Sequence, residues 1–217
     1  MGRSQAAVVR VLGSHCWLRE AAASGRAAAL RMALLLAVAV VCAPAHSQAC
    51  DKPVYLTFDT GHMDIAPLVA DVLRRHGVKA TFFAANERTK VGDGSLGAHW
   101  AAWWKARADE GHEFASHTWD HVYWRADLPG DPPRFRVRAS AGPEAGRDQV
   151  WSAAQYCQEI DRAARRLQQV TGRPPLPLYR APGGKTSPRL VAAARSCGWQ
   201  HVGWSPAGFL GDELPSE

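Results

Sequence analysis

Short runs of apolar, β-branched and aromatic residues alternate along the chain with longer stretches whose apolar residues recur at helical spacing. The short runs are typical of strands. They are Val54–Phe58, Ala80–Ala84, Glu113–Ser116, Leu176–Arg180 and His201–Trp204. The alternation of strands with helices predicts an α/β fold with a parallel sheet, either open or closed into a barrel.

Three helices are predicted between these strands. The first has apolar residues at the i, i+3, i+4, i+7 and i+8 positions of one helix face and ends at Gly77. The second covers Trp151–Val170. The third opens at Ser187-Pro188, a capping serine followed by a proline at the first helical position, and ends at Gly198. The stripe of the first helix consists of Ile65, Leu68, Val69, Val72 and Leu73.

The segment Ala126–Gly146 is rich in proline, glycine and arginine and has no clear period. We therefore predict a long loop there. Loops of this length in a compact domain are usually functional or mobile.

Composition and charge narrow the classes of function. Hydrophobic residues make up 47% of the chain and charged residues 21%, which is typical of a globular protein and excludes a disordered one. The formal charge of +6 points toward an anionic partner. However, residues 1–49 hold five of the 26 basic and one of the 20 acidic residues, which leaves 21 against 19 and a net charge of +2 for residues 50–217. No nucleic-acid partner is therefore expected.

Residues 1–49 have the pattern of a leader with a secretory signal peptide. Arg31 precedes an apolar core at 33–43, and small residues follow, with cleavage expected after Ala45 or Ala49. The alternatives are a membrane anchor and a buried helix, but an anchor needs about 20 apolar residues. We expect an exported protein, periplasmic or extracellular, with no stable membrane span after cleavage.

Export would place the domain in an oxidising compartment, where disulfides form. The mature part keeps Cys50, Cys157 and Cys197. Because this number is odd, one cysteine is expected to be unpaired or to pair outside the chain.

Three chemically distinct residues stand at the end of a predicted strand or directly after it: Asp59, His117 and Arg180. In parallel sheets and barrels the C-terminal strand ends form one face, where catalytic residues collect. Taken singly, Asp59 is also explained as a turn or helix cap, and Arg180 as a surface arginine. Together they predict a site at this face.

The segment His117-Thr-Trp-Asp-His121 carries the strongest local signal. Two histidines four apart lie on the same side of a helical turn, which suits two positions on one zinc ion. A pair of solvated or core histidines is the alternative, and the spacing alone favours it. The position directly after a strand favours the metal. The H-E-x-x-H pattern of metalloproteases is excluded because Thr118 stands where it requires glutamate.

The order TFD (57–59), HTWDH (117–121) and RAPGG (180–184) resembles the signatures of the polysaccharide deacetylase family, which contains the NodB-homology domain and is also called carbohydrate esterase family 4. The resemblance spans residues 52–205. It implies a distorted (β/α) barrel over residues 50–217. It also implies a hydrolase that removes N-acetyl groups from an N-acetylated polysaccharide or cell-envelope glycan.

The resemblance also implies a role for each residue. His117 and His121 would bind a divalent metal, normally Zn²⁺, Asp59 would be the general base, and Arg180 would orient Asp59. Substrate-binding residues and oligomeric state are left open.

The sequence departs from the family pattern in two places. Thr60 stands where the family has a second aspartate, its third metal ligand, and His62 and Asp64 are candidate substitutes, although Asp64 is equally suited to cap the helix that follows. No later L-x-H motif supplies a general acid, since His201 falls inside a predicted strand, and the domain is expected to lack its last strands. The alternative function is a glycan-binding protein without catalysis.

Overall fold

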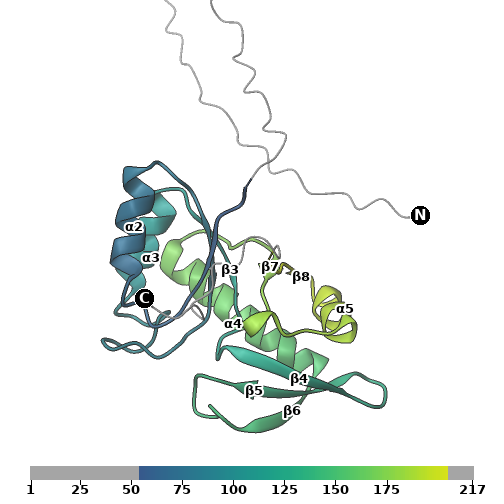
Figure 1. Cartoon of the computed structure of the whole chain (residues 1–217). Coiled ribbons are helices and arrows are strands. Elements are labelled where there is room, and N and C mark those ends of the chain that lie inside the picture. The colour runs from purple at the N-terminus through teal and green to yellow at the C-terminus, as the bar shows by residue number, and fades with distance from the viewer. Residues whose placement is uncertain (1–53, 205–217) are drawn as a thin grey trace, which may run out of the picture. The chain divides into compact units, whose positions relative to one another are not determined.

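Five short parallel strands form the main sheet, in the order β1-β2-β3-β7-β8. Three of them, β3, β7 and β8, are labelled in Figure 1. The structure is a computed structural model and describes residues 54–204, all of which belong to one compact unit. The predicted leader lies outside the described residues. The strands are β1 (Thr57–Asp59), β2 (Thr81–Ala84), β3 (Glu113–Ser116), β7 (Leu178–Tyr179) and β8 (Gln200–His201). The five predicted strands are thus confirmed; β3 has the predicted bounds, and the other four are shorter than predicted.

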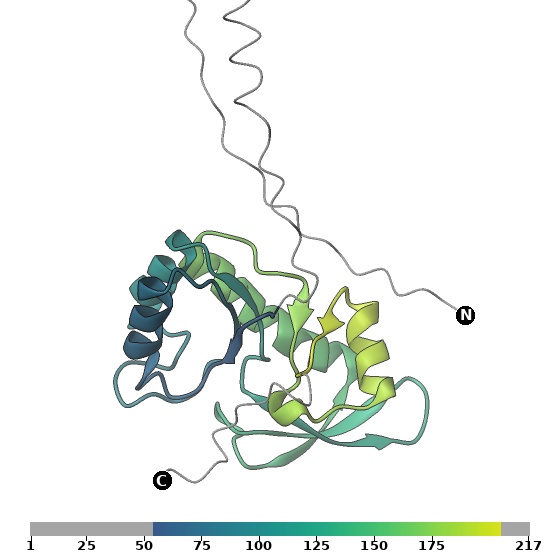
Figure 2. The ribbon, with the colours of Figure 1, turned by 45° about the horizontal axis from the view of Figure 1, so that its top comes forward.

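Four helices link these strands: α2 (Ala66–Arg75), α3 (Ala101–Asp109), α4 (Ala153–Thr171) and α5 (Pro188–Ser196). The spatial order of the strands follows their order in the chain, and α4 packs against α3 on one side and α5 on the other (Figure 2). This is the winding of a (β/α) barrel, because a doubly wound sheet reverses its strand order in the middle. The predicted α/β class is confirmed, and β1 and β8 are the edges of the sheet within the described residues.

The predicted loop at Ala126–Gly146 is wrong, because the chain forms a second, antiparallel sheet there. Its strands are β4 (Val122–Leu128), β5 (Arg134–Ala139) and β6 (Asp148–Ser152). Along β5, Phe135 and Val137 are fully buried and alternate with exposed arginines, which is the period of a half-buried strand. The prolines lie between the strands, at 129–133 and 143.

The helix ends follow from local capping. Ser152 caps α4 by accepting a hydrogen bond from the Gln155 amide. The sequence predicts that the helix begins at Trp151, but Trp151 belongs to β6. Ser187 caps α5 in the same way through the Leu190 amide, as the sequence predicts. Both caps satisfy amides that have no partner within their helix.

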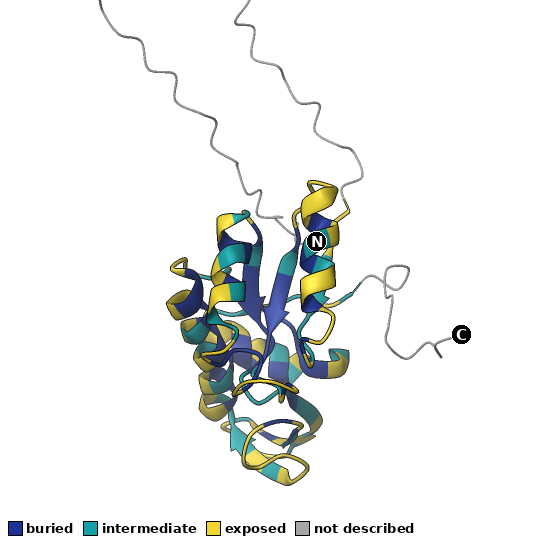
Figure 3. Ribbon diagram, turned by 90° about the vertical axis from the view of Figure 1, so that its left-hand side faces the viewer, coloured by how far each residue is buried: buried dark blue, intermediate teal, exposed yellow. Residues whose placement is uncertain are grey.

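Helix α2 forms as predicted, but only part of its apolar stripe faces the core. Leu73 is 4% exposed, whereas Leu68 is 61% and Ile65 68% exposed. The buried face also contains Ala66 and Ala70. In Figure 3 the strands between the helices are buried and the outer helix faces are exposed.

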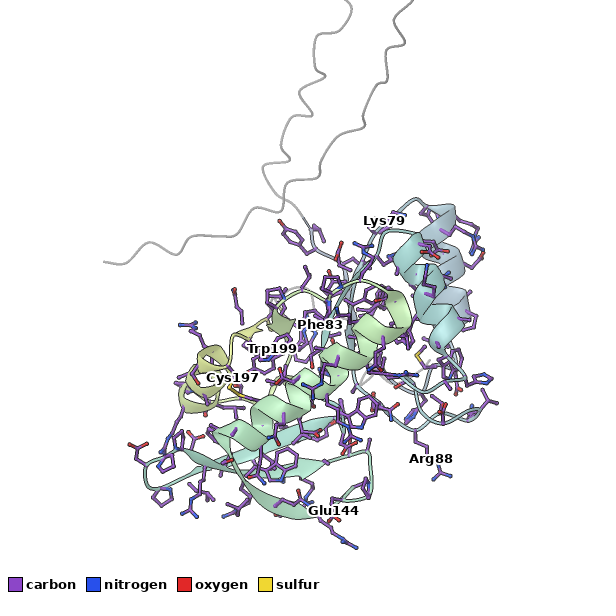
Figure 4. The ribbon with its side chains drawn as sticks, turned by 180° about the vertical axis from the view of Figure 1, so that it is seen from behind. Lys79, Phe83, Arg88, Glu144, Cys197 and Trp199 are labelled. Carbon is purple, nitrogen blue, oxygen red and sulfur yellow. A yellow bond between two sulfur atoms is a disulfide. The ribbon has the colours of Figure 1, made fainter. Side chains whose placement is uncertain are left out.

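Two apolar clusters make up the core, and α4 contributes to both. Leu167 packs in the cluster with Phe82 and Trp104, while Ile160 packs in the cluster with Tyr179 and the second sheet. A disulfide joins Cys157 of α4 to Cys197, the residue after α5 (Figure 4). It accounts for two of the three cysteines, and Cys50 lies outside the described residues.

Candidate active site

Asp59 is the last residue of β1, and Arg180 directly follows β7. Arg180 Nη1 donates a hydrogen bond to Asp59 Oδ1 at 2.6 Å. The Arg180 guanidinium also lies 4.0 Å above the Phe83 ring, and its side chain is 2% exposed. The carboxylate–guanidinium contact therefore sits at the C-terminal strand ends, where the sequence places it.

His117 directly follows β3, and its ring is fixed from one side by Arg180. Its Nδ1 lies 2.9 Å from the Arg180 carbonyl oxygen. A carbonyl can only accept, so Nδ1 carries the proton and Nε2 keeps a lone pair. That Nε2 lies 3.6 Å from Asp59 Oδ2. Asp59, His117 and Arg180, from three different strands, thus form one cluster.

His121 stands beside His117, with ring centroids 4.9 Å apart. Its Nδ1 is 2.6 Å from Ser140 Oγ. Because that hydroxyl donates to the His121 carbonyl at 3.3 Å, it accepts from Nδ1 and leaves Nε2 with a lone pair.

The predicted helical turn between the two histidines is wrong. Thr118 and His121 have positive φ angles of 63° and 48°. The amides of Trp119 and Asp120 donate to the backbone and the side chain of Glu159 in α4, at 3.0 and 2.9 Å. These bonds to α4 replace those that a helix would form within the segment. Strained backbone of this kind is concentrated at functional sites.

Burial sets the charge state of the cluster. Desolvation lowers the pKa of His117 to about 4, and desolvation together with neighbouring His117 lowers the pKa of His121 to about 3. Burial raises the pKa of Asp59, against the opposing effect of Arg180. Both imidazoles are therefore neutral at pH 7, as metal ligands must be.

The side chains of the cluster are chemically suited to bind a divalent metal, but within the described residues they do not form a complete set of ligands. Two neutral imidazoles with free Nε2 atoms stand next to the Asp59 carboxylate, and hydrogen bonds at Nδ1 fix both rings, as is usual for zinc ligands. Within residues 54–204, no three His, Cys, Asp or Glu side chains form a group that could hold a metal ion as they stand.

Thr60 takes no part in this set. Its hydroxyl accepts from the Ala85 amide at 2.8 Å and donates to the Ala85 carbonyl at 3.3 Å, so it ties β1 to the end of β2. Of the candidate substitutes, Asp64 is engaged elsewhere, since it pairs with Lys90 at 2.6 Å, whereas His62 has its Nδ1 2.7 Å from the Arg88 carbonyl, the same kind of contact that holds His117. Asp64 does not cap α2.

Glu87 is a site residue that the sequence reasoning missed. It follows β2, and its Oε1 lies 3.7 Å from His121 Nδ1, with only 13% of its side chain exposed. The available signal was the same as for Asp59, an acidic residue shortly after a buried strand.

The described residues therefore define an α/β protein with an Asp–Arg–His cluster at the C-terminal strand ends. The family model for polysaccharide deacetylases matches residues 46–202. The chain belongs to the polysaccharide deacetylase family.

Two curated relatives illustrate the similarity. The chain is 27% identical over 158 residues to the peptidoglycan-N-acetylmuramic acid deacetylase PdaA of Bacillus subtilis, covering 72% of this chain and 48% of that protein. It is 26% identical over 153 residues to a chitooligosaccharide deacetylase of Azorhizobium caulinodans, covering 70% and 58%. The chain thus spans about half the length of the curated relatives it matches.

Among solved structures, a pseudoenzyme of the CE4 family from Bacillus anthracis matches with a TM-score of 0.50 and 17% identity, covering 70% of this chain and 43% of that one. At this identity the likeness shows the fold alone.

Proposed function

We propose that the chain is a metal-dependent hydrolase that removes N-acetyl groups from an N-acetylated polysaccharide or cell-envelope glycan. The observation that carries the proposal is the contact of Asp59 with Arg180 and His117 at the strand ends, in a chain of this family. The relatives named above, deacetylases of peptidoglycan and chitooligosaccharide, support this substrate class.

Asp59 is the general base in this proposal. Arg180 holds Oδ1, which leaves Oδ2 to accept a proton from the attacking water. Burial makes the carboxylate more basic by raising its pKa, while the Arg180 charge favours the ionised form that a base needs. Arg180 thus orients the base and keeps it ionised.

His117 and His121 would hold Zn²⁺ through their Nε2 atoms. When bound, the ion supplies Lewis acidity to the amide carbonyl and to a water. The Arg180 carbonyl and the Ser140 hydroxyl keep the two rings in place by holding their Nδ1 protons.

A second candidate function is glycan binding without catalysis. It is favoured by the engagement of Thr60 with Ala85 and by the lack of a three-residue metal group within residues 54–204. Glycan binding that is independent of metal, with no acetate released, is its expected signature.

We also propose that the protein is exported to the periplasm or the extracellular space. The leader pattern at 1–49 and the disulfide between Cys157 and Cys197 support this, because disulfides persist in oxidising compartments. None of the helices in residues 54–204 has the length and apolar character needed to cross a bilayer.

The proposal is tested by acetate release from N-acetylglucosamine oligomers and from peptidoglycan, with and without a chelator. Loss of the general base in Asp59→Asn is expected to slow release on the order of 10²–10⁴-fold. Asp71→Asn is the matched control, since Asp71 is an exposed residue of α2 that pairs with Arg74 and Arg75. Undiminished release with chelator or in Asp59→Asn would rule the proposal out.

A further inference from the structure

A basic hollow opens beside His121, between strands β4 and β5 and the loop after β7. Its volume is about 530 Å³, and its lining includes Tyr123, Arg125, Arg138, Ser140 and Lys185. We call it the basic cleft.

The basic cleft adjoins the candidate active site, because two of its lining residues contact His121. The Tyr123 ring lies 5.0 Å from the His121 ring at 86°, and Ser140 Oγ is the atom that holds His121 Nδ1 at 2.6 Å. A molecule that fills the cleft therefore reaches the histidine side of the cluster.

The charges of the cleft are only partly neutralised. Arg138 pairs with Asp148 at 2.7 Å. Arg125 and Lys185 are exposed, and within residues 54–204 neither forms a close ion pair, although the charge of Arg125 acts on Asp148 from a longer distance. Lys185 Nζ instead lies 5.4 Å from the centre of the Tyr123 ring. The lining thus carries three cationic side chains, of which only one is paired.

Strand β5 extends this charge away from the site. Arg134, Arg136 and Arg138 alternate with buried Phe135 and Val137, so the arginines share the open face of the sheet, roughly 7 Å apart.

The three arginines of β5 are poorly explained as charges that serve only to keep the protein surface soluble. Charged residues commonly protect sheet edges, but β5 is the central strand of its sheet. Arg136 faces Ala126 and Val150 across the two ladders, and Arg134 faces Leu128 and Ser152, so neither has an acidic partner directly opposite. The like charges of these arginines repel one another, and an anionic ligand would relieve that repulsion.

We propose that the basic cleft binds the carboxylate groups of an acidic N-acetylated glycan, with an N-acetyl group directed to the Asp59–His117–His121 cluster. This rests on the proposed function and specifies its substrate as a polyanionic polysaccharide, in contrast to a neutral chitin-like one. Arginine forks match carboxylates. Single-stranded nucleic acid is disfavoured because its binding usually uses several stacking aromatic residues, and this lining provides one.

The test is binding of the purified chain to hyaluronan oligosaccharides, which alternate N-acetylglucosamine with glucuronic acid, and to carboxyl-reduced oligosaccharides of equal length. The acidic probe is expected to bind at least about tenfold more tightly, with a preference that fades at high salt. In Arg125→Gln/Lys185→Gln this binding is expected to weaken on the order of tenfold.

The matched control is Arg75→Gln/Arg165→Gln, which removes two charges from the exposed outer sides of α2 and α4, and it should bind like wild type. Thermal unfolding of every variant verifies folding. Equal affinity for acidic and reduced probes, or equal weakening in cleft and control variants, would overturn the proposal. The proposal would also be overturned if a single-stranded DNA of equal charge displaced labelled hyaluronan at the same concentration as unlabelled hyaluronan does.

Acetate release, measured in parallel, separates this inference from the function on which it rests. Acetate release without preferential binding of the acidic probe would contradict the proposed role of the basic cleft but not the deacetylase function. Charge-selective binding without release supports the cleft and counts against the deacetylase function.

Discussion

At the scale of single residues, Arg180 assembles the candidate site. Its Nη1 fixes Asp59, its carbonyl fixes His117, and its Nε and Nη2 donate to the carbonyls of Val202 and Gly203 at 3.1 and 3.4 Å. The buried Arg180 side chain thus connects the ends of β1 and β8. The Arg180 backbone amide donates to the carbonyl of Ser116, the last residue of β3. A buried cation is tolerated only with such partners, so Arg180 has a structural as well as a chemical role.

Glu87 provides a prediction about the proposed metal site. Its carboxylate lies on the Nδ1 side of His121, where acidic groups orient histidine ligands and make them more basic. Glu87→Gln is therefore expected to weaken zinc binding about 10–100-fold, measured by competition with a chromogenic chelator. Glu144→Gln, in the exposed turn between β5 and β6, is the control. Equal affinity in wild type and Glu87→Gln would remove Glu87 from the site.

The site residues that the sequence predicts are positioned by strand topology, whereas those that it does not predict are positioned by contacts between segments distant in sequence. Asp59, His117 and Arg180 were predictable because parallel strand ends meet at one edge whatever the details of packing. The conformation of the turn at Thr118 depends on contacts with Glu159, and Glu87 becomes a site residue only through its nearness to His121, and both partners are distant in sequence. No local pattern encodes such contacts.

Among the elements, the second sheet shows that turn residues next to a strand can make its sequence resemble a loop. Phe135 and Val137 alternate with arginines and are by themselves a strand signal, but the prolines at 129–133 lie directly before them. Those prolines occupy the turn that makes a hairpin of β4 and β5. A proline-rich stretch between alternating segments is therefore compatible with a short sheet as well as a loop.

Helix α2 offers a matched pair of substitutions, because Leu68 and Leu73 belong to the same predicted stripe. Leu73 is 4% exposed within the core cluster, whereas Leu68 is 61% exposed. Leu73→Ala should lower the free energy of unfolding by about 2–5 kcal/mol. Leu68→Ala should change it by less than about 0.5 kcal/mol. Urea denaturation compares the two, and equal losses would mean that both side chains are packed.

His112, between α3 and β3, predicts a pH dependence of stability. It is 1% exposed, and its Nδ1 accepts the Ala80 amide proton at 3.1 Å. Burial lowers the pKa of His112, despite the nearby Glu110. A folded pKa below the unfolded one gives stability that is present above about pH 6.5 and is lost as the pH falls.

His112→Asn keeps an acceptor near that amide but cannot take up a proton. Between pH 7 and 5, wild type should therefore lose more unfolding free energy than His112→Asn, measured by urea denaturation with chelator present. The other buried histidines titrate in both proteins and cancel in the difference. A steeper loss in the variant would contradict the prediction.

At the scale of the whole described unit, α4 is the element that holds the parts together. Its two ends pack in different cores, one with the parallel sheet and one with the second sheet. Its residue Glu159 also binds the turn between the two site histidines. The geometry of the site therefore depends on how firmly α4 is anchored to its neighbours.

The disulfide between Cys157 and Cys197 is one such anchor, because it ties α4 to the end of α5 across 40 residues of sequence. A cross-link that closes a loop of this length restricts the unfolded chain and stabilises the fold by about 4 kcal/mol. Cys157→Ser/Cys197→Ser is therefore expected to melt on the order of 10 °C below wild type in a thermal scan.

Reductant provides the internal control. It should lower the melting temperature of wild type toward that of Cys157→Ser/Cys197→Ser and leave the double variant unchanged, because the bond is already absent there. If reductant shifted both proteins equally, the stabilisation would lie elsewhere. If neither reductant nor substitution lowered the melting temperature, packing of Ile160 and Tyr156 against α5 and the second sheet would alone account for the position of α4.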